Sequence, residues 1–244
     1  MKVVIDSRFD NLSSFISEIP VLMESGQGDV VYDKRNKVVR FHHQGETLIV
    51  KRFKQVNIVQ QLVYTFFRKS KAERAYLFAE EFGNRGIETP QRVAFMEDSR
   101  MGLFLTGYFV SKEAVGTETH LLLREVQDYD PLLAEAVAQQ VVLLHSKGIL
   151  HGDLNLSNFL CREDAEGYHF TMIDINRSKF CEGYPTDRQC LENLVRLTHR
   201  RDLYEDLVRR YATLRGWAAD DTARRALSLL DRFENRKFRL IKLL

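Results

Sequence analysis

The sequence predicts an α+β protein whose strands and helices are segregated along the chain. Three observations support this fold class. Short runs rich in Val, Ile and Phe, separated by turn residues, fill the first half. Apolar residues at helical spacing fill most of the second half. The chain has 244 residues, enough for one large domain or for two small lobes.

Five strands and one long helix are predicted in the first half. The runs DVVYDK and KVVRFHH flank a turn near residues 35–36, and a second turn, QGE, leads into TLIVKRF. A helical stretch follows from about Val56 to Gly86, because Gly86 is a suitable helix stop and Pro90 begins an extended segment. The runs QRVAFME and GLFLTGYFV then form a hairpin across DSRMG.

The second half is predicted to be mostly helical around two short strands. LLAEAVAQQVVLLHSKG has helical periodicity and ends at Gly148. ILHGDLNLSNFLC and YHFTMIDI are short apolar runs around polar groups, and REDAEG joins them as a hairpin turn. Two or three amphipathic helices are expected from Asp187 onward. The boundary is placed between Ser111 and Gly116, which gives lobes of residues 1–112 and 113–244.

Composition excludes several classes of function. The net charge of +2 argues against a nucleic-acid-binding protein. The cysteines at positions 161, 181 and 190 contain no C-x-x-C pair, which argues against a structural zinc site and favours a reducing compartment. No signal peptide is visible, and no run approaches eighteen uninterrupted apolar residues. We therefore expect a soluble cytoplasmic protein.

One group of polar residues is suited to phosphoryl transfer. That reaction needs a carboxylate for the acceptor hydroxyl, oxygen ligands for Mg²⁺ and a cation on the phosphates. Asp153 and Asn158 are five residues apart, and Asp174 follows after the hairpin. Lys51, at the end of the third strand, supplies the cation. Each residue alone is explained by a turn, a cap or a solvated strand end, but the ordered combination favours a catalytic site.

These motifs resemble those of the protein-kinase-like superfamily. HGDLNLSNFL resembles the catalytic loop H-x-D-x-x-x-x-N in the H-G-D form of small-molecule kinases, MIDINRSKF resembles the D-F-G region, and LIVKRF resembles the strand-three lysine motif. VYTFFRKSKAERA, GIETP and DINRSKF are most similar to the lipopolysaccharide kinases, which phosphorylate Kdo or heptose of the inner core. The resemblance covers roughly Asp29 to Phe180.

The resemblance implies a bilobal kinase-like fold. The first lobe would hold a five-stranded antiparallel sheet with one main helix, and the second would be compact and mostly helical. ATP and Mg²⁺ would be the cofactors. Asp153 would act as catalytic base or orient the hydroxyl, Asn158 and Asp174 would ligate Mg²⁺, and Lys51 would hold the α- and β-phosphates.

Two further residues receive roles from the resemblance. A helix glutamate is expected to pair with Lys51; Glu73 is the first choice, and Glu80, on the same helical face, is the second. His151 is expected to brace the catalytic loop.

Several departures point to a small-molecule or glycolipid kinase. The first turn, YDKRNKVV, lacks G-x-G-x-x-G, so backbone amides or Lys34 and Arg35 would have to cover the phosphates. Gly152 replaces the Arg of H-R-D, Asn155 stands where many protein kinases have a phosphate-contacting Lys, and Asn176 replaces the Gly of D-F-G. No A-P-E segment follows, which argues against a regulated protein kinase.

The expected function is ATP-dependent phosphorylation of a Kdo or heptose hydroxyl in the lipopolysaccharide inner core. The alternatives are a kinase for another small molecule or a protein, and a non-catalytic pseudokinase that binds partners. An acidic pocket in the second lobe would favour a cationic substrate, and a basic one a phosphorylated glycolipid. The basic-aromatic residues 64–74 are explained either by helix packing or by contact with anionic lipid at the inner membrane.

Overall fold

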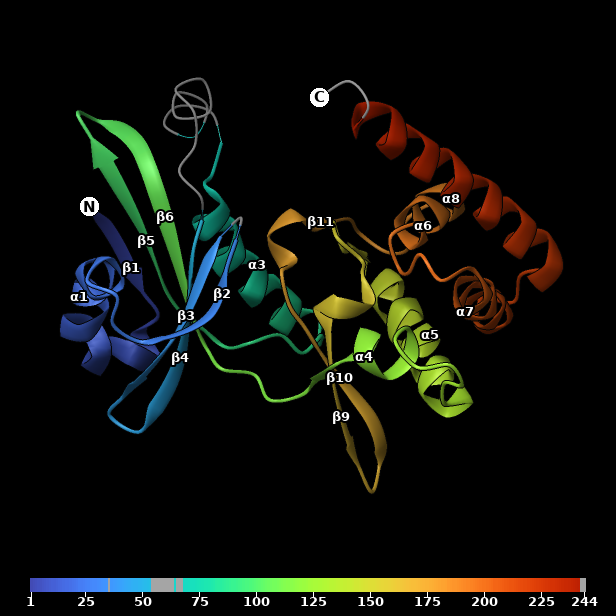
Figure 1. Ribbon diagram of the computed structural model, residues 1–244, viewed down its shortest axis with the longest axis horizontal. Helices are drawn as coiled ribbons and strands as arrows, with labels where there is room; N and C mark the ends of the chain where they lie inside the picture. Colours follow the sequence, from blue (N-terminus) through green and yellow to red (C-terminus); the bar gives the residue numbers. More distant parts are fainter. Residues whose placement is uncertain (35, 54–63, 65–67, 242–244) are drawn as a thin grey trace. The chain divides into compact units, whose positions relative to one another are not determined.

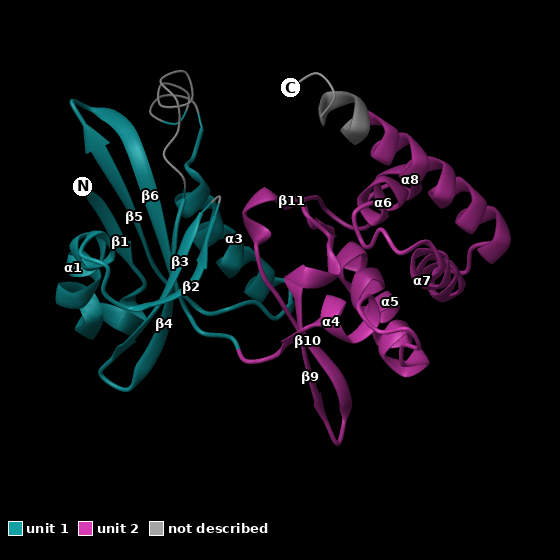
Figure 2. Cartoon of the chain, in the orientation of Figure 1, with its two compact units in different colours: residues 1–114 teal, residues 115–244 magenta. Residues whose placement is uncertain are grey.

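The computed structural model describes residues 1–34, 36–53, 64 and 68–241, and the chain divides into two compact units, residues 1–114 and 115–244 (Figure 2). In unit 1, the helices and strands are β1 Lys2–Ile5, α1 Ser13–Glu24, β2 Asp29–Asp33, β3 Lys37–His43, β4 Glu46–Arg52, α3 Lys71–Asn84, β5 Arg92–Arg100 and β6 Leu103–Lys112. A 3₁₀ helix, Ser7–Leu12, precedes α1.

The first unit contains an antiparallel sheet in the order β1-β5-β6-β4-β3-β2, which confirms the predicted α+β class. The sheet has six strands, so the predicted number of five is wrong. The additional strand, β1, is only four residues long, and it pairs with β5 through Val3 opposite Met96. A run this short carries almost no period-2 signal of its own, since partner pairing is what stabilises it.

Helices cover both faces of this sheet (Figure 1). α1 packs on one face through Ile16, Ile19 and Met23, and α3 packs on the other face. The sequence prediction of one main helix missed α1 because Pro20 lies inside it. Proline in a helix interior costs about 3 kcal/mol. Full burial of the three apolar side chains, each contributing about 1.5–3 kcal/mol, outweighs that cost.

The long predicted helix of residues 56–86 is described in its second part, as α3, and residues 54–63 and 65–67 lie outside the described residues. Ser70 caps α3, because its Oγ accepts a hydrogen bond from the Glu73 N–H at 3.0 Å. Gly86, with φ of 73°, ends the turn as predicted. The helix approaches β6 closely at Gly107, where a Cβ atom would lie 2.9 Å from that of Ala72.

In unit 2, the helices and strands are β7 Thr117–Glu118, α4 Thr119–Leu123, α5 Pro131–Ser146, β8 Ile149–Leu150, β9 Phe159–Asp164, β10 Gly167–Met172, β11 Lys179–Phe180, α6 Asp187–Leu194, α7 Arg201–Leu214 and α8 Ala219–Ile241. β9 and β10 form the hairpin predicted across REDAEG, and β7 pairs with β9. The core lies between α5, α7 and α8, where Leu144, Tyr204 and Tyr211 are fully buried.

One short pairing positions the polar loops of this unit. β8 pairs with β11, with Leu150 opposite Lys179 and Ile149 opposite Phe180. The loop that follows β8 is therefore held beside the loop that precedes β11. Along the described part of the chain, no helix is both long enough and apolar enough to span a bilayer.

Candidate active site

The loop of residues 151–158, between β8 and β9, is fixed by hydrogen bonds to its own backbone. Asn158 Nδ2 donates to the carbonyl oxygen of Asp153 at 2.8 Å. Asn155 Oδ1 accepts from the Ser157 N–H at 3.0 Å and so caps the 3₁₀ turn Leu156–Asn158. The Asp153 side chain remains 32% exposed. The five-residue spacing thus places Asp153 and Asn158 in one rigid loop with the carboxylate accessible.

His151 joins this loop to the segment before Asp174. Its Nε2 donates to the Ile173 carbonyl at 3.0 Å, so Nδ1 is the acceptor for the Asp153 N–H at 3.2 Å. The Ile173 N–H in turn donates to the Asn158 carbonyl at 3.0 Å. The imidazole is fully buried, and burial lowers its pKa. His151 is therefore a neutral brace, which agrees with the structural role expected from the sequence.

Asp174 has an unusual backbone conformation. Its φ of 56° and ψ of 39° lie in the left-handed region, which non-glycine residues adopt rarely and at some cost in energy. Asn176, which replaces the Gly of D-F-G, lies in the 3₁₀ turn Ile175–Arg177. Asn176 is buried, and its Nδ2 donates to Asp174 Oδ1 at 2.7 Å. Asn176 thus orients the Asp174 carboxylate.

Gly152 marks the closest approach of the two loops. A Cβ atom on this residue would lie 2.1 Å from the backbone oxygen of Arg177 and 2.5 Å from its carbonyl carbon. No side chain fits there unless the backbone moves. This contact explains why the motif is H-G-D here: the Arg177 backbone fills the space that a side chain at residue 152 would need.

Two arginines that the sequence analysis did not single out flank the Asp153 carboxylate. Arg177 Nη1 lies 3.8 Å from Asp153 Oδ2, and Arg196 Nη1 lies 3.7 Å from Oδ1. Both side chains are 42% exposed. The position two residues after Asp153 is Asn155, so the positive charge here comes from other segments of the chain. Arg177 follows Asp174 closely in sequence, but no pattern predicts the contact of Arg196.

A chain of hydrogen bonds supports the loop of residues 151–158. Asn193 Nδ2, on α6, donates to the His151 carbonyl at 2.7 Å. Asn193 Oδ1 accepts from His145 Nε2 at 3.2 Å, and His145 Nδ1 accepts from the Tyr211 hydroxyl at 2.8 Å. His145 is fully buried, and burial lowers its pKa to about 4. The chain connects α7, α5 and α6 to the loop, and sequence spacing gives no sign of it.

The predicted phosphate-binding residues lie in unit 1. Lys51 is on β4, opposite Val38 and Phe109, and its Nζ lies 5.6 Å from the centre of the Phe53 ring. Glu73 is in the first turn of α3, and its carboxylate lies 3.9 Å from Lys2.

Glu80, the reserve candidate, forms an ion pair with Arg92 at 2.7 Å. Arg92 also binds the buried Asp6 at 3.0 Å, so Glu80 belongs to a network that joins α3 to β5. Glu73 therefore remains the better candidate, and its pairing with Lys51 stays a prediction.

The donor atoms at Asn158 and Asp174 suit a hard cation. Asn158 turns its Nδ2 toward Asp153, which leaves Oδ1 as the atom that can face a metal ion. Asn176 donates a hydrogen bond to the Asp174 carboxylate and so would hold that ligand in place. An amide oxygen and a carboxylate are ligands that Mg²⁺ accepts together with water and phosphate. Within the described residues, no cluster of three or more His, Cys, Asp or Glu side chains suggests a different metal centre.

Comparison with known proteins identifies the family. The family model described as "Lipopolysaccharide kinase (Kdo/WaaP) family" matches residues 26–219. The chain belongs to this family. The resemblance found in the motifs is therefore confirmed, and the protein is a lipopolysaccharide kinase by family: a phosphotransferase that uses ATP. A search among curated proteins gives no match.

The solved structures that are similar to the chain include the following two. "WaaP in complex with acyl carrier protein" matches with 18% identity and a TM-score of 0.62, covering 98% of this chain and 99% of that one. This likeness supports the kinase-like fold. The Rio2 kinase-ADP/Mg²⁺-phosphoaspartate complex from Chaetomium thermophilum matches with 15% identity and a TM-score of 0.46, covering 92% of this chain and 77% of that one.

Proposed function

We propose that this protein transfers the γ-phosphoryl group of ATP to a hydroxyl of Kdo or heptose in the lipopolysaccharide inner core. The observation that carries the proposal is the rigid loop 151–158, in which Asp153 and Asn158 are bonded to each other and braced against Ile173 by His151. Family membership supplies the substrate class. The loop also contains an accessible carboxylate, which phosphoryl transfer to an alcohol requires.

In this reaction the acceptor hydroxyl oxygen attacks the γ-phosphorus, and the bond to the β–γ bridging oxygen breaks to release ADP. Asp153 orients the hydroxyl and accepts its proton. Arg177 and Arg196, on either side of the carboxylate, are placed to offset negative charge on the transferred group. They would replace the lysine that is missing at Asn155.

The remaining roles concern the nucleotide. Lys51 would hold the α- and β-phosphates, and Glu73 would orient Lys51. Mg²⁺ held by Asn158 and Asp174 would neutralise charge on the phosphates. The turn between β2 and β3 occupies the place of a glycine-rich loop, and the Lys34 N–H there bonds to the Asn36 carbonyl at 3.3 Å. Of the two basic residues predicted to cover the phosphates, Lys34 is described in the structure and Arg35 lies outside the described residues.

The decisive experiment measures transfer of labelled γ-phosphate from Mg-ATP to purified inner-core lipopolysaccharide. Asp153→Asn is the matched variant, because it keeps the shape of the side chain and removes the proton acceptor. We expect transfer by the wild type and a loss of at least about 10³-fold in the variant, with ATP affinity within about threefold. Normal turnover by Asp153→Asn would refute the assignment. Absence of both transfer and Mg-ATP binding would favour the pseudokinase alternative.

We also propose peripheral contact with the inner membrane, where the glycolipid acceptor resides. Arg68 and Lys69 are exposed just before α3, and anionic lipid attracts such residues; Phe66 and Phe67 lie outside the described residues. Vesicle flotation with and without anionic lipid tests this contact. Binding that is equal on neutral and anionic vesicles would contradict the electrostatic part of the proposal.

A further inference from the structure

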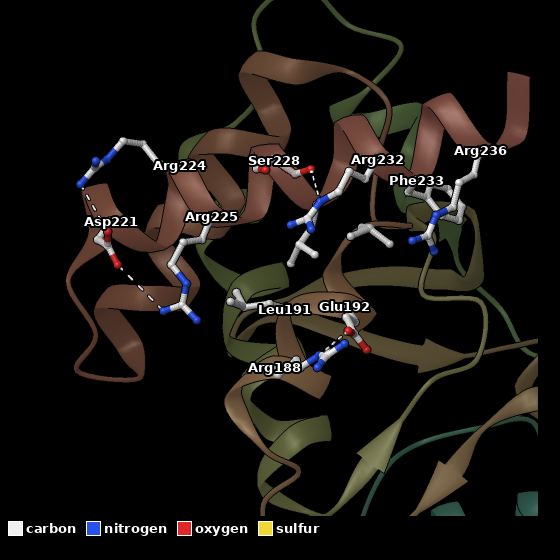
Figure 3. Close-up of a pocket in the computed structure, with 12 residues that line it drawn as sticks. Arg188, Leu191, Glu192, Asp221, Arg224, Arg225, Ser228, Arg232, Phe233 and Arg236 are labelled. Atoms are coloured by element: carbon white, nitrogen blue, oxygen red, sulfur yellow. Dashed lines mark hydrogen bonds and ion pairs between the residues drawn. The ribbon is translucent and has the colours of Figure 1, made fainter. Parts of the chain in front are cut away.

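A groove between α6 and α8 carries an excess of arginine (Figure 3). It has a volume of about 860 Å³ and an apolar floor that includes Leu191 and Val195, both buried. Two carboxylates line it, against five arginines: Arg188, Arg224, Arg225, Arg232 and Arg236. A volume of this size accommodates a small-molecule group, and the charge favours an anion.

The two carboxylates of the groove are already engaged. Glu192 binds Arg188 at 2.8 Å, one helical turn away on α6. Asp221 lies 3.3 Å from Arg224 and 3.9 Å from Arg225 at the start of α8 (Figure 3). These pairs are exposed, and exposed ion pairs stabilise a fold only weakly, so a stronger anionic ligand can compete for the arginines.

The two carboxylates in the second half of α8 do not line the groove. Asp231 and Glu234 bind Arg201 on α7, at 2.6 and 2.9 Å. Arg232 and Arg236, one turn apart on α8, have no carboxylate within 4 Å in the described part of the chain. Like charges at this spacing destabilise a helix slightly. The arrangement concentrates positive charge at this end of the groove.

This end of the groove adjoins the catalytic loop. Phe233 lines the groove, and the Arg196 guanidinium lies 5.0 Å from the centre of its ring. The same guanidinium reaches to 3.7 Å from Asp153. One side chain therefore spans the distance between the groove wall and the proposed catalytic carboxylate.

We propose that the α6–α8 groove binds the phosphate groups of the glycolipid acceptor and so presents its sugar hydroxyl to Asp153. This inference rests on the proposed function, because the ligand is the acceptor of that reaction. Guanidinium groups bind phosphate through paired, charge-assisted hydrogen bonds. From Asp221 to Arg236 the groove follows about 22 Å of helix, so it can hold several separated phosphates of one ligand.

An acidic protein surface is the competing occupant. The position of the groove favours the glycolipid as its ligand. A docking protein could bind at any surface, whereas an acceptor must reach Asp153. Arg196 places the arginine-rich end of the groove directly beside that carboxylate.

The test uses the full-length double variant Arg225→Gln/Arg232→Gln. Its matched control is Arg100→Gln/Arg162→Gln, which removes the same charge at exposed positions outside the groove. Equilibrium binding is measured without ATP, at one fixed salt concentration, to inner-core glycolipid micelles and to the same glycolipid after its phosphates are removed. Acceptor KM and kcat are measured in parallel, together with the melting temperature.

The groove variant should bind the phosphorylated glycolipid at least about tenfold more weakly than the wild type, and its acceptor KM should rise by a similar factor. The control should stay within about twofold, because neither of its two arginines lines the groove. Removing the phosphates should abolish the difference between the variants. The melting temperature should change little, since the Asp221–Arg225 pair that is lost is exposed and Arg232→Gln removes a like-charge pair.

Equal binding by groove variant and control would overturn the inference while leaving the kinase assignment intact. So would a loss of affinity that persists without phosphates, or a loss confined to an acidic protein ligand. Conversely, phosphate-dependent binding through the groove with no transfer to any acceptor would support the groove and refute the proposed reaction.

Discussion

Replacing Gly152 by alanine would test whether the two loops of the site must lie in contact. The new Cβ would lie 2.1 Å from the Arg177 backbone oxygen, whereas real Cβ atoms essentially never come closer than 3.0 Å to such an atom. The loops would have to separate by about 1 Å, and the packed interior transmits such a shift. A displacement of about 1 Å in a catalytic group costs roughly 100-fold in rate. Overpacking also destabilises by about 1–3 kcal/mol.

We therefore expect Gly152→Ala to lower kcat about 100-fold and to lower the free energy of unfolding by about 2 kcal/mol. Phosphate transfer and urea denaturation measure the two effects. Gly83→Ala is the matched control, because a Cβ on Gly83 in α3 meets nothing within 4 Å, and alanine favours helix. A Gly152→Ala protein with wild-type kcat and stability would show that the loops are not held as described.

Two further predictions concern the hydrogen-bond chain behind the loop. Asn193→Ala removes a hydrogen-bond donor to the His151 carbonyl and leaves the buried His145 Nε2 without its acceptor. The free energy of unfolding should therefore fall by about 1–3 kcal/mol, and kcat should fall more than ATP affinity. An unchanged kcat would show that Asn193 does not position the loop. His145, whose pKa is lowered to about 4, resists a proton that the unfolded chain takes up near pH 6.5. The free energy of unfolding should therefore fall as the pH drops through 6.5 toward 4. In urea titrations, His145→Gln should reduce the stability lost between pH 7 and pH 5 by about 2 kcal/mol. An identical pH dependence in wild type and variant would contradict this prediction.

The parts of the fold that the sequence predicted are those with strong local signals. β2 to β6 combine β-branched residues with turns that place glycine at positive φ, such as Gly45 and Gly102 with φ of 78° and 80°. β1 and α1 were missed because their stability is not local: one depends on pairing with β5, and the other tolerates Pro20 only through burial against the sheet.

The candidate site shows the same division. Asp153, Asn158 and Asp174 could be proposed from the sequence, because the first two are five residues apart and Asp174 follows the β9–β10 hairpin. Asn193 and Arg196 could not, since their partners His151 and Asp153 lie more than 40 residues earlier and the contacts exist only once α6 packs beside the loop. Nor did the sequence reveal that Gly152 is required for close approach, because the constraint comes from the Arg177 backbone.

The structure bears on the choice between an active kinase and a binding module. A protein that only binds partners through a kinase-shaped surface does not need an aspartate in a strained backbone conformation. Asp174 nevertheless adopts the left-handed conformation, at a cost of about 1–3 kcal/mol. Partner binding also does not require a buried neutral histidine that fixes the Asp153 backbone, or two arginines beside an accessible carboxylate. These features are explained by the placement of groups for phosphoryl transfer. Together they favour catalysis, even though the first strands lack a glycine-rich loop.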